Sequence, residues 1–390
     1  MELIAPRPGD HLEDLSDVFA RTFSGYWDQV AFARGGYIGE STYDWSASRV
    51  GVVDGRIVTH FGVWDFGMRI GGEVVRVAGI GAVATLQTHR KQGLMAQTAG
   101  SAVNGLHDAG YDLSLLFGIP DFYHRFGYIT AFGQIRTTLK TADVRPGPEV
   151  SYERYDGPVT ALADLYNREN EGITGTYVRP TYRTNRMPAT FTVYRFADGY
   201  LVGGRDGNSW QVADCAGDPR VVVEIARRCA AEAICPEIEF VYFPPRSRVG
   251  EYLQTITHRT VIDRHPGGGP MLKTVNLHRT LTRIAPELGR RLASSPMSGY
   301  AGTLLLKGDS NAVLLDFRSG EVGDVRKADA GSSADGRVIA GTALGRLVIG
   351  DGDPRRICRQ SGVELEGDAH DLVPVLFPDQ EPSTIYWDRF

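Results

Sequence analysis

The chain has 390 residues, and its 47 acidic and 42 basic side chains give a net charge of −5. At roughly 100–200 residues per domain this length predicts two to four domains, and the share of hydrophobic residues is that of an ordinary globular protein. The slight acidic excess argues against nucleic acid as the main partner, because phosphate binding requires a basic patch. It is compatible with a cationic ligand, although it is also the usual charge of a cytosolic protein.

The cysteines and the start of the chain indicate a reducing compartment. The cysteines form no CxxC pair and have no histidine at metal-binding spacing, so we expect buried free thiols, no disulfide and no metal. They are Cys215, Cys229, Cys235 and Cys358. The first residues lack a basic start followed by an apolar run, and no stretch approaches the roughly 18 apolar residues of a membrane span. We therefore expect a cytoplasmic protein that does not bind membranes.

The first third of the chain alternates helix and strand signals. Apolar residues in Leu12–Phe23 have helical spacing after a candidate cap at Asp10. Two β-rich runs follow, broken by Asp-Gly at 54–55 and Gly-Gly at 71–72, and these dipeptides predict the hairpins of an antiparallel meander. An amphipathic helix is predicted at 94–106. Beyond it, strands are predicted at 113–117 and 135–139.

Two stretches rich in proline and glycine, TADVRPGPEV (141–150) and HPGGGP (265–270), divide the rest of the chain. The predicted domains are therefore 1–142, 150–264 and 271–390. The second domain is a further α/β unit without a glycine-rich loop before its helix at 221–233. The third is a compact α+β domain, with a helix at 281–292 and strands in GTLLLKG, NAVLLDFRSG and GRLVIG.

The segment AVATLQTHRKQGLMAQ predicts a strand, a basic loop and a helix. The exposed backbone N–H groups at a helix start carry partial positive charge, which suits a pyrophosphate. Gly93 lets the backbone approach a phosphate oxygen, and Arg90 and Lys91 add positive charge. The alternative is an ordinary α/β turn, since many such turns carry glycine and arginine without binding phosphate.

A tyrosine follows one strand later, in LLFGIPDFYHRFGY. The phenol of Tyr123 has an ordinary pKa of about 10, so it is protonated at pH 7 and can donate a proton to a leaving thiolate. The alternative is an aromatic cluster that packs against the sheet, and we prefer that interpretation for Phe122 and Phe126.

In this order and spacing, the two segments resemble the signature of GNAT acetyltransferases. The run from Arg90 to Met95 matches the family pattern Arg/Gln-x-x-Gly-x-Gly/Ala except at Met95, and FYHRFGY matches the FYxRxGY element downstream. THRKQGLM, GYDLSLLF and FYHRFGY together are similar to the Eis (enhanced intracellular survival) family. That resemblance implies an α/β protein with two tandem GNAT-like domains, the second without the pyrophosphate loop, followed by a sterol-carrier-like α+β domain.

The resemblance also implies acetyl-CoA as cosubstrate and a role for particular residues. The backbone of Val83, Ala84 and Thr85 would take the pantetheine arm as an added strand. Tyr123 would be the proton donor. The pyrophosphate loop would comprise Lys91, Gln92, Gly93, Leu94, Met95 and Ala96. Eis-type proteins form hexamers, so a homo-oligomer is expected.

In the Eis family the C-terminus enters the active site, and its carboxylate is the general base. Here that role would fall to the α-carboxylate of Phe390, with a reference pKa of about 3.3–3.7. A frayed tail is the alternative, although the ending TIYWDRF is unusually apolar for one. Arg389 and Ala82 depart from the best-known aminoglycoside-modifying member, so that class of acceptor is in doubt.

We therefore expect transfer of an acetyl group to a primary amine, on a small molecule or a lysine side chain, by direct attack. Two other functions stay open from the sequence. One is an inactive acyl- or lipid-binding module that uses the last domain. The other is a regulatory protein-lysine acetyltransferase whose second domain supplies a docking face.

Overall fold

The computed structural model describes residues 1–390 except 24–25, 40, 182–190, 310, 385–387 and 389–390. The described chain forms two compact units. The first unit contains residues 1–131 and 265–380, and the second contains residues 132–264 and 381–389.

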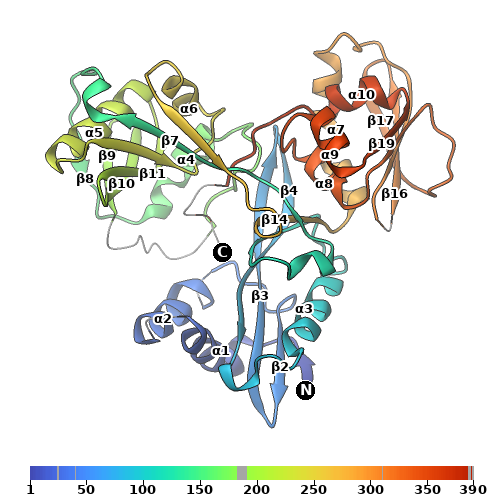
Figure 1. Cartoon of the computed structure of the whole chain (residues 1–390), viewed down its shortest axis with the longest axis horizontal. Helices are drawn as coiled ribbons and strands as arrows, with labels where there is room; N and C mark the ends of the chain where they lie inside the picture. Colours follow the sequence, from blue (N-terminus) through green and yellow to red (C-terminus); the bar gives the residue numbers. More distant parts are fainter. Residues whose placement is uncertain (24–25, 40, 182–190, 310, 385–387, 389–390) are drawn as a thin grey trace. The chain divides into compact units, whose positions relative to one another are not determined.

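A sheet of seven strands, in the order β1-β2-β3-β4-β5-β14-β6, forms the centre of the first unit. The strands are β1 (Glu2–Ile4), β2 (Arg49–Val53), β3 (Arg56–Ile70), β4 (Glu73–Thr85), β5 (Leu113–Gly118), β6 (Ile129–Thr130) and β14 (Gly269–Thr274). Helices α1 (Pro8–Thr22) and α2 (Tyr26–Phe32) lie on one face, and α3 (Leu94–Gly105) lies on the other (Figure 1). Tight turns join β2 to β3 and β3 to β4, which confirms both predicted hairpins.

The start of α1 differs from the prediction. The helix begins at Pro8, and the residue before it, Arg7, makes no side-chain cap, so the predicted cap at Asp10 is wrong. Proline is favoured at the first helical position, where its missing N–H and fixed φ cost nothing. Asp10 lies inside the first turn, where its negative charge still interacts favourably with the positive end of the helix dipole.

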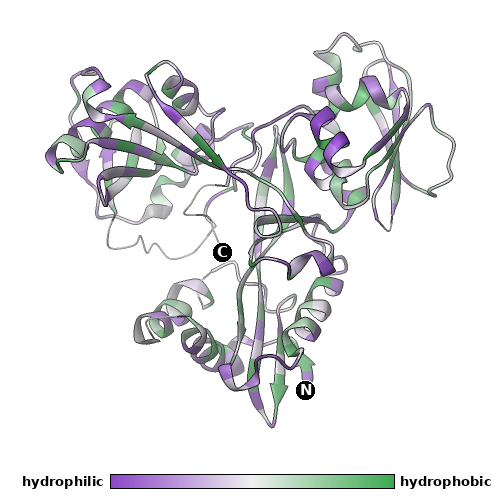
Figure 2. Cartoon of the chain, in the orientation of Figure 1, coloured by the Kyte–Doolittle hydropathy of each residue, from purple (hydrophilic) through white to green (hydrophobic). Residues whose placement is uncertain are grey.

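The core between the sheet and α3 follows from the period-2 alternation of β3. Phe61 and Val63 are fully buried on the α3 side, while His60 and Trp64 point to the face covered by α1 and α2. The hydroxyl groups of Thr59 and Thr98 lie 2.7 Å apart in the interior and join β3 to α3. Figure 2 shows that the helices carry both hydrophobic and hydrophilic bands, as elements packed on one side require.

The C-terminal part of the first unit has a second sheet, with the strand order β17-β16-β15-β18-β19. Its strands are β15 (Gly302–Lys307), β16 (Ala312–Arg318), β17 (Glu321–Ala328), β18 (Gly336–Ile339) and β19 (Glu364–Gly367), and its helices are α7 (Leu277–Ala293), α8 (Leu344–Val348), α9 (Pro354–Ser361) and α10 (Ala369–Leu376). The predicted strand GRLVIG is wrong, because most of it forms α8. Leu344, Leu347 and Val348 recur at helical spacing and are all buried, and such a short apolar run fits either structure by pattern alone.

Helix α7 connects this part of the unit to the seven-stranded sheet. The fully buried carboxylate of Asp112, just before β5, accepts from Arg279 Nε at 2.5 Å and pairs with Arg283 Nε at 2.8 Å. It also accepts from the backbone N–H of Arg76 at 2.7 Å. Its charge is thus compensated by two guanidinium groups, and removing one partner of such a pair usually costs several kcal/mol, about 3–5.

The second unit also has a seven-stranded sheet, in the order β13-β7-β12-β11-β10-β9-β8. Its strands are β7 (Gln134–Lys140), β8 (Glu153–Arg154), β9 (Thr192–Phe196), β10 (Gly199–Asp206), β11 (Ser209–Ala216), β12 (Glu237–Val241) and β13 (Arg259–Asp263), and its helices are α4 (Ala163–Glu169), α5 (Pro219–Glu232) and α6 (Arg248–Leu253). Leu201 packs in the cluster that includes α5, whereas its neighbours Tyr200 and Val202 pack in the cluster that includes α4. The two helices therefore cover opposite faces.

Each sheet is completed by a strand that is distant in sequence. β14 lies between β5 and β6 in the first unit, and β7 takes the corresponding place between β12 and β13 in the second. The predicted domain ranges 1–142 and 271–390 therefore differ from the units at these two strands. Pairing between strands that are about a hundred residues or more apart leaves no local pattern in the sequence. The composition of the linkers therefore could not reveal which sheet β7 and β14 join.

The four cysteines are free and buried, as expected. None of the helices in the described parts of the chain is both long and apolar enough to span a membrane.

Candidate active site

The seven-stranded sheet of the first unit opens between two parallel neighbours. β4 and β5 pair from Val77 and Leu113 up to Ile80 and Leu116. β4 continues to Thr85 and stays paired with β3, but within the described residues its other edge has no strand beyond Ile80. The N–H and C=O groups on that edge are a template for an extended ligand, which would add as a strand does. Val83, Ala84 and Thr85 lie on this segment.

A β-bulge marks the place where the strands separate. Between the pairs His60–Ala84 and Gly62–Gly81, β4 has two residues where β3 has one. Ala82 lies in this bulge with φ of 46°, an unusual value for a residue with a Cβ atom. Bulges bend the strand and redirect its side chains, so this one turns the end of β4 away from β5.

The predicted phosphate loop lies between β4 and α3 and is exposed. Lys91 and Gly93 have positive φ values of 62° and 74°, so the chain turns sharply before the helix begins at Leu94. Within the described residues no side chain caps this helix. The first hydrogen bond into it runs from the Gln97 N–H to the Gly93 carbonyl, so the preceding N–H groups remain open to an anion.

Tyr123 lies in a 3₁₀ helix, Tyr123–Phe126, that follows β5, and its side chain is buried. Burial raises the pKa of its phenol to about 12, so the group is protonated at neutral pH. A Cβ atom on Gly118 would come within 2.8 Å of the Tyr123 ring, so only glycine at the end of β5 allows the ring to lie there. The sequence analysis missed Gly118, which has no motif of its own.

Three of the predicted site residues lie on one hydrophobic cluster. Tyr123, Val83 and Met95 all contact the cluster between the sheet and α3. The open edge of β4, the start of α3 and the proposed proton donor therefore lie around the same side of the sheet. Phe122 and Phe126 pack against that cluster too, as preferred from the sequence. Phe390 lies outside the described residues.

Residues 11–131 match the family model described as an acetyltransferase (GNAT) domain. The first unit carries a GNAT acetyltransferase domain. This confirms the prediction that the chain is an acyltransferase. A comparison with curated proteins finds no match.

Solved structures resemble the chain over nearly its full length. A GCN5-related N-acetyltransferase from Anabaena variabilis matches at a TM-score of 0.73 and 17% identity, covering 98% of each chain. One from Kribbella flavida matches at 0.69 and 19%, covering 98% of this chain and 97% of the other. Eis1 from Mycobacterium abscessus matches at 0.69 and 16%, covering 97% of each chain. At these identities the likeness shows the fold, and it confirms an α/β protein with tandem GNAT-like units.

On the opposite face of the GNAT sheet lies a buried pair that the sequence analysis missed. The Tyr43 hydroxyl and His60 Nε2 are 2.7 Å apart, and His60 is paired with Ala84 across the strands. Burial lowers the pKa of His60 to about 4, so its ring is neutral at pH 7. No motif marks either residue, because the contact depends on the packing of α1 and α2 against β3.

The second unit has the same opening between parallel strands but a different helix start. β11 and β12 pair as far as Val212 and Phe240, after which β11 continues alone on that side within the described residues. The turn before α5 is capped by the Asp218 side chain, which accepts from the Arg220 N–H at 2.9 Å. A capped start with a carboxylate repels an anion.

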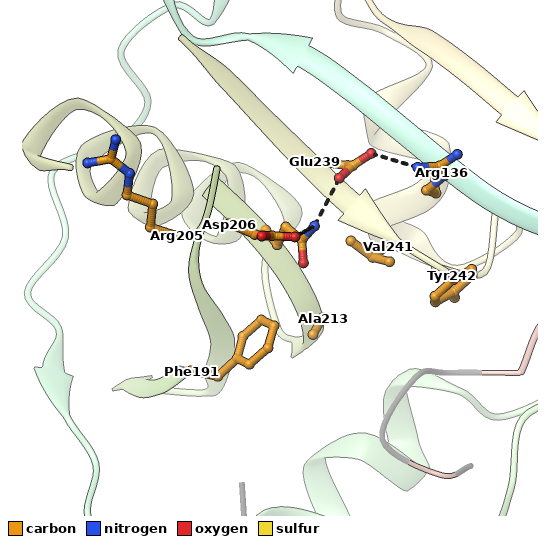
Figure 3. Close-up of a pocket in the computed structure, with 9 residues that line it drawn as sticks. Arg136, Phe191, Arg205, Asp206, Ala213, Glu239, Val241 and Tyr242 are labelled. Carbon is orange, nitrogen blue, oxygen red and sulfur yellow. Dashed lines mark hydrogen bonds and ion pairs between the residues drawn. The ribbon is translucent and has the colours of Figure 1, made fainter. Parts of the chain in front are cut away.

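A pocket of about 390 Å³ lies at this opening, beside Ala213, Val241 and Tyr242 (Figure 3). Within it, Glu239 lies 3.7 Å from Arg136 and accepts from Gln211 at 3.2 Å, whereas Arg205 donates to the carbonyls of Gly207 and Ala233. Among the described residues, no group of three or more His, Cys, Asp and Glu could hold a metal ion.

Gly93 provides a direct test of the phosphate loop. We expect G93E to weaken acetyl-CoA binding at least about tenfold relative to G93Q, because only the glutamate places a negative charge where the pyrophosphate would approach. The matched control G93Q has the same size and the same strain at positive φ. Titration calorimetry gives both affinities, and equal values for the two variants would remove the pyrophosphate from this loop.

Proposed function

We propose that the protein is an acetyl-CoA-dependent N-acetyltransferase whose acceptor is a primary amine, on a small molecule or on a lysine side chain. The observation that carries this proposal is the open edge of β4 beside an uncapped helix start, with Tyr123 on the same hydrophobic cluster. An extended thioester with a phosphate group at its far end is the ligand that such an arrangement fits.

The residues present fit acetyl-CoA as the acyl donor. The backbone of Val83, Ala84 and Thr85 would bind the amides of the pantetheine arm along the open edge of β4. The N–H groups of residues 91–96 would bind the pyrophosphate, supported by the charge of Lys91. Arg90 donates from Nε to the Thr85 carbonyl at 3.2 Å, which fixes the loop against the end of β4.

The chemistry is a direct transfer. The amine nitrogen attacks the thioester carbonyl carbon, a C–N bond forms, and the C–S bond breaks with its electron pair on sulfur. Tyr123 donates its phenolic proton to that sulfur and regains one from solvent. A base takes the proton that the nitrogen loses, so atoms and charge balance.

For the base, we propose the α-carboxylate of Phe390. When ionised it is acceptor-only, and it can then take the proton of an ammonium group directly or through water. Such a weak base works only when it is desolvated beside the acceptor. We also propose that the chain forms a homo-oligomer in the cytoplasm and that the part of the first unit from α7 to α10 is a sterol-carrier-like domain.

The test of this function is an assay of thiol release from acetyl-CoA with a panel of amines. We expect release that depends on both acetyl-CoA and an amine, with the acetylated amine identified by mass spectrometry. Small amines, aminoglycosides and lysine peptides separate the acceptor classes. The proposal fails if no amine accelerates thiol release while acetyl-CoA still binds.

A further inference from the structure

A buried ion pair network lies in the second unit, on the face that α4 covers. Arg179 Nη1 lies 2.5 Å from Asp214 Oδ2, and Arg179 Nη2 lies 2.9 Å from Asp388 Oδ2. The Arg179 side chain is 9% exposed, and both carboxylates are 1% exposed. The guanidinium also lies 3.5 Å from the centre of the Tyr166 ring. One arginine therefore joins a carboxylate of β11 to one near the end of the chain.

The geometry of the network is specific for Asp388. Arg179 Nε and Nη2 both donate to this carboxylate, at 3.0 and 2.9 Å, in the two-point arrangement that a planar guanidinium favours. The Thr181 hydroxyl donates to its Oδ1 at 2.9 Å. Exposed ion pairs contribute little to stability. A buried carboxylate has lost its contact with water, so losing its ionic and hydrogen-bonding partners is strongly destabilising.

The segment before Asp388 is bound to the same unit. The Ser383 hydroxyl donates to the Tyr242 carbonyl at 3.1 Å, and the Ser383 N–H donates to the Thr174 carbonyl at 3.3 Å. A Cβ atom on Gly175 would come within 2.7 Å of the Ser383 backbone, so a glycine permits this close approach. The described residues 382–384 are buried.

These contacts lie at the opening between β11 and β12. Asp214 is the second residue of β11 beyond the last parallel pair at Val212, and Tyr242 directly follows β12. In the GNAT domain the corresponding part of β4 is the edge proposed for the cofactor. At this position the second unit binds a segment of its own chain, whereas in the first unit the edge of β4 has no neighbouring strand among the described residues.

We propose that the second GNAT-like unit holds the C-terminal segment of its own chain, with Arg179, Asp214 and Asp388 as positioning residues that fix where the chain end lies. The consequence for catalysis rests on the proposed function, in which the Phe390 carboxylate is the base. The anchoring itself does not depend on that role. The second GNAT-like unit would then hold in place the C-terminal segment that carries the proposed base.

The test variant is D388N, which keeps the size of the side chain and leaves the Arg179–Asp214 pair in place. We expect carboxypeptidase Y to release the C-terminal residues at least about tenfold faster from native D388N than from the parent, as followed by mass spectrometry, because a neutral amide binds the guanidinium weakly. The matched control is E381Q, whose ion pair with Arg246 is exposed, and we expect parental release from it.

Turnover and acetyl-CoA affinity are measured on the same samples. Faster release with lower kcat and unchanged acetyl-CoA affinity supports both the anchor and the catalytic tail. Faster release with parental kcat keeps the anchor and removes the tail from catalysis. Parental release from folded D388N overturns the anchor, whatever its activity. If D388N does not fold, R179K carries the same comparison, since it keeps the charge and loses the two-point contact.

Discussion

Replacing Tyr123 by phenylalanine is expected to lower turnover by about 10²–10⁴-fold, the usual loss when a general acid is removed. Only the hydroxyl is lost, and the ring still fits against Gly118, so we expect folding and acetyl-CoA affinity to be unchanged. Steady-state kinetics and calorimetry measure the two effects separately.

The matched control for this variant is Y128F. Tyr128 is fully buried and its hydroxyl lies 2.7 Å from that of Ser114, so its loss should cost stability, about 1 kcal/mol, rather than turnover. Near-parental activity of Y123F would leave Tyr123 as a packing residue. Because burial raises the pKa of Tyr123 to about 12, the parent should also keep its proton donor as the pH rises through the ordinary tyrosine pKa of about 10.

Extending the chain beyond Phe390 by a few residues is expected to lower kcat at least about tenfold, because a peptide bond replaces the carboxylate proposed as the base. Acetyl-CoA binding should change little, since the extension leaves residues 83–85 and 91–96 unaltered in sequence. Turnover at saturating amine measures the effect.

The same residues added before Met1 serve as the control for the extension itself. Unchanged turnover of the C-terminal extension would show that the tail is not the base. Comparing the extended protein with D388N distinguishes loss of the proposed base from a change in the position of the C-terminal segment.

Local patterns predicted most of the GNAT domain correctly. The hairpin turns, α3 and the loop around Gly93 follow from dipeptides, amphipathic spacing and one glycine at positive φ, all of which are encoded within a few residues. The site also required Gly118, but a single glycine at a strand end carries no signal until the ring of Tyr123 is known to lie on it.

Contacts between residues that are distant in the chain could not be predicted from the sequence. Arg179 and Asp388 are 209 residues apart, and the notable feature of the tail in the sequence was its aromatic residues rather than this aspartate. The pair forms because both side chains meet in a buried space that the fold creates. The strand GRLVIG failed for a related reason, since the short apolar run was assigned without knowing that it packs as a helix.

The late position of β14 in the sequence also constrains how the chain folds. β5, an apolar strand of sequence LSLLFG, pairs on one side with β14, which lies more than a hundred residues later, beyond residues 132–264 of the second unit. Until residues 269–274 leave the ribosome, the edge of β5 that faces away from β4 lacks the strand that covers it in the folded protein. Unpaired apolar edges associate with other chains. The sheet of the GNAT domain therefore needs residues 269–274 for completion, and we expect a fragment ending at residue 131 to contain Tyr123 and the loop around Gly93 and still present an open, aggregation-prone edge.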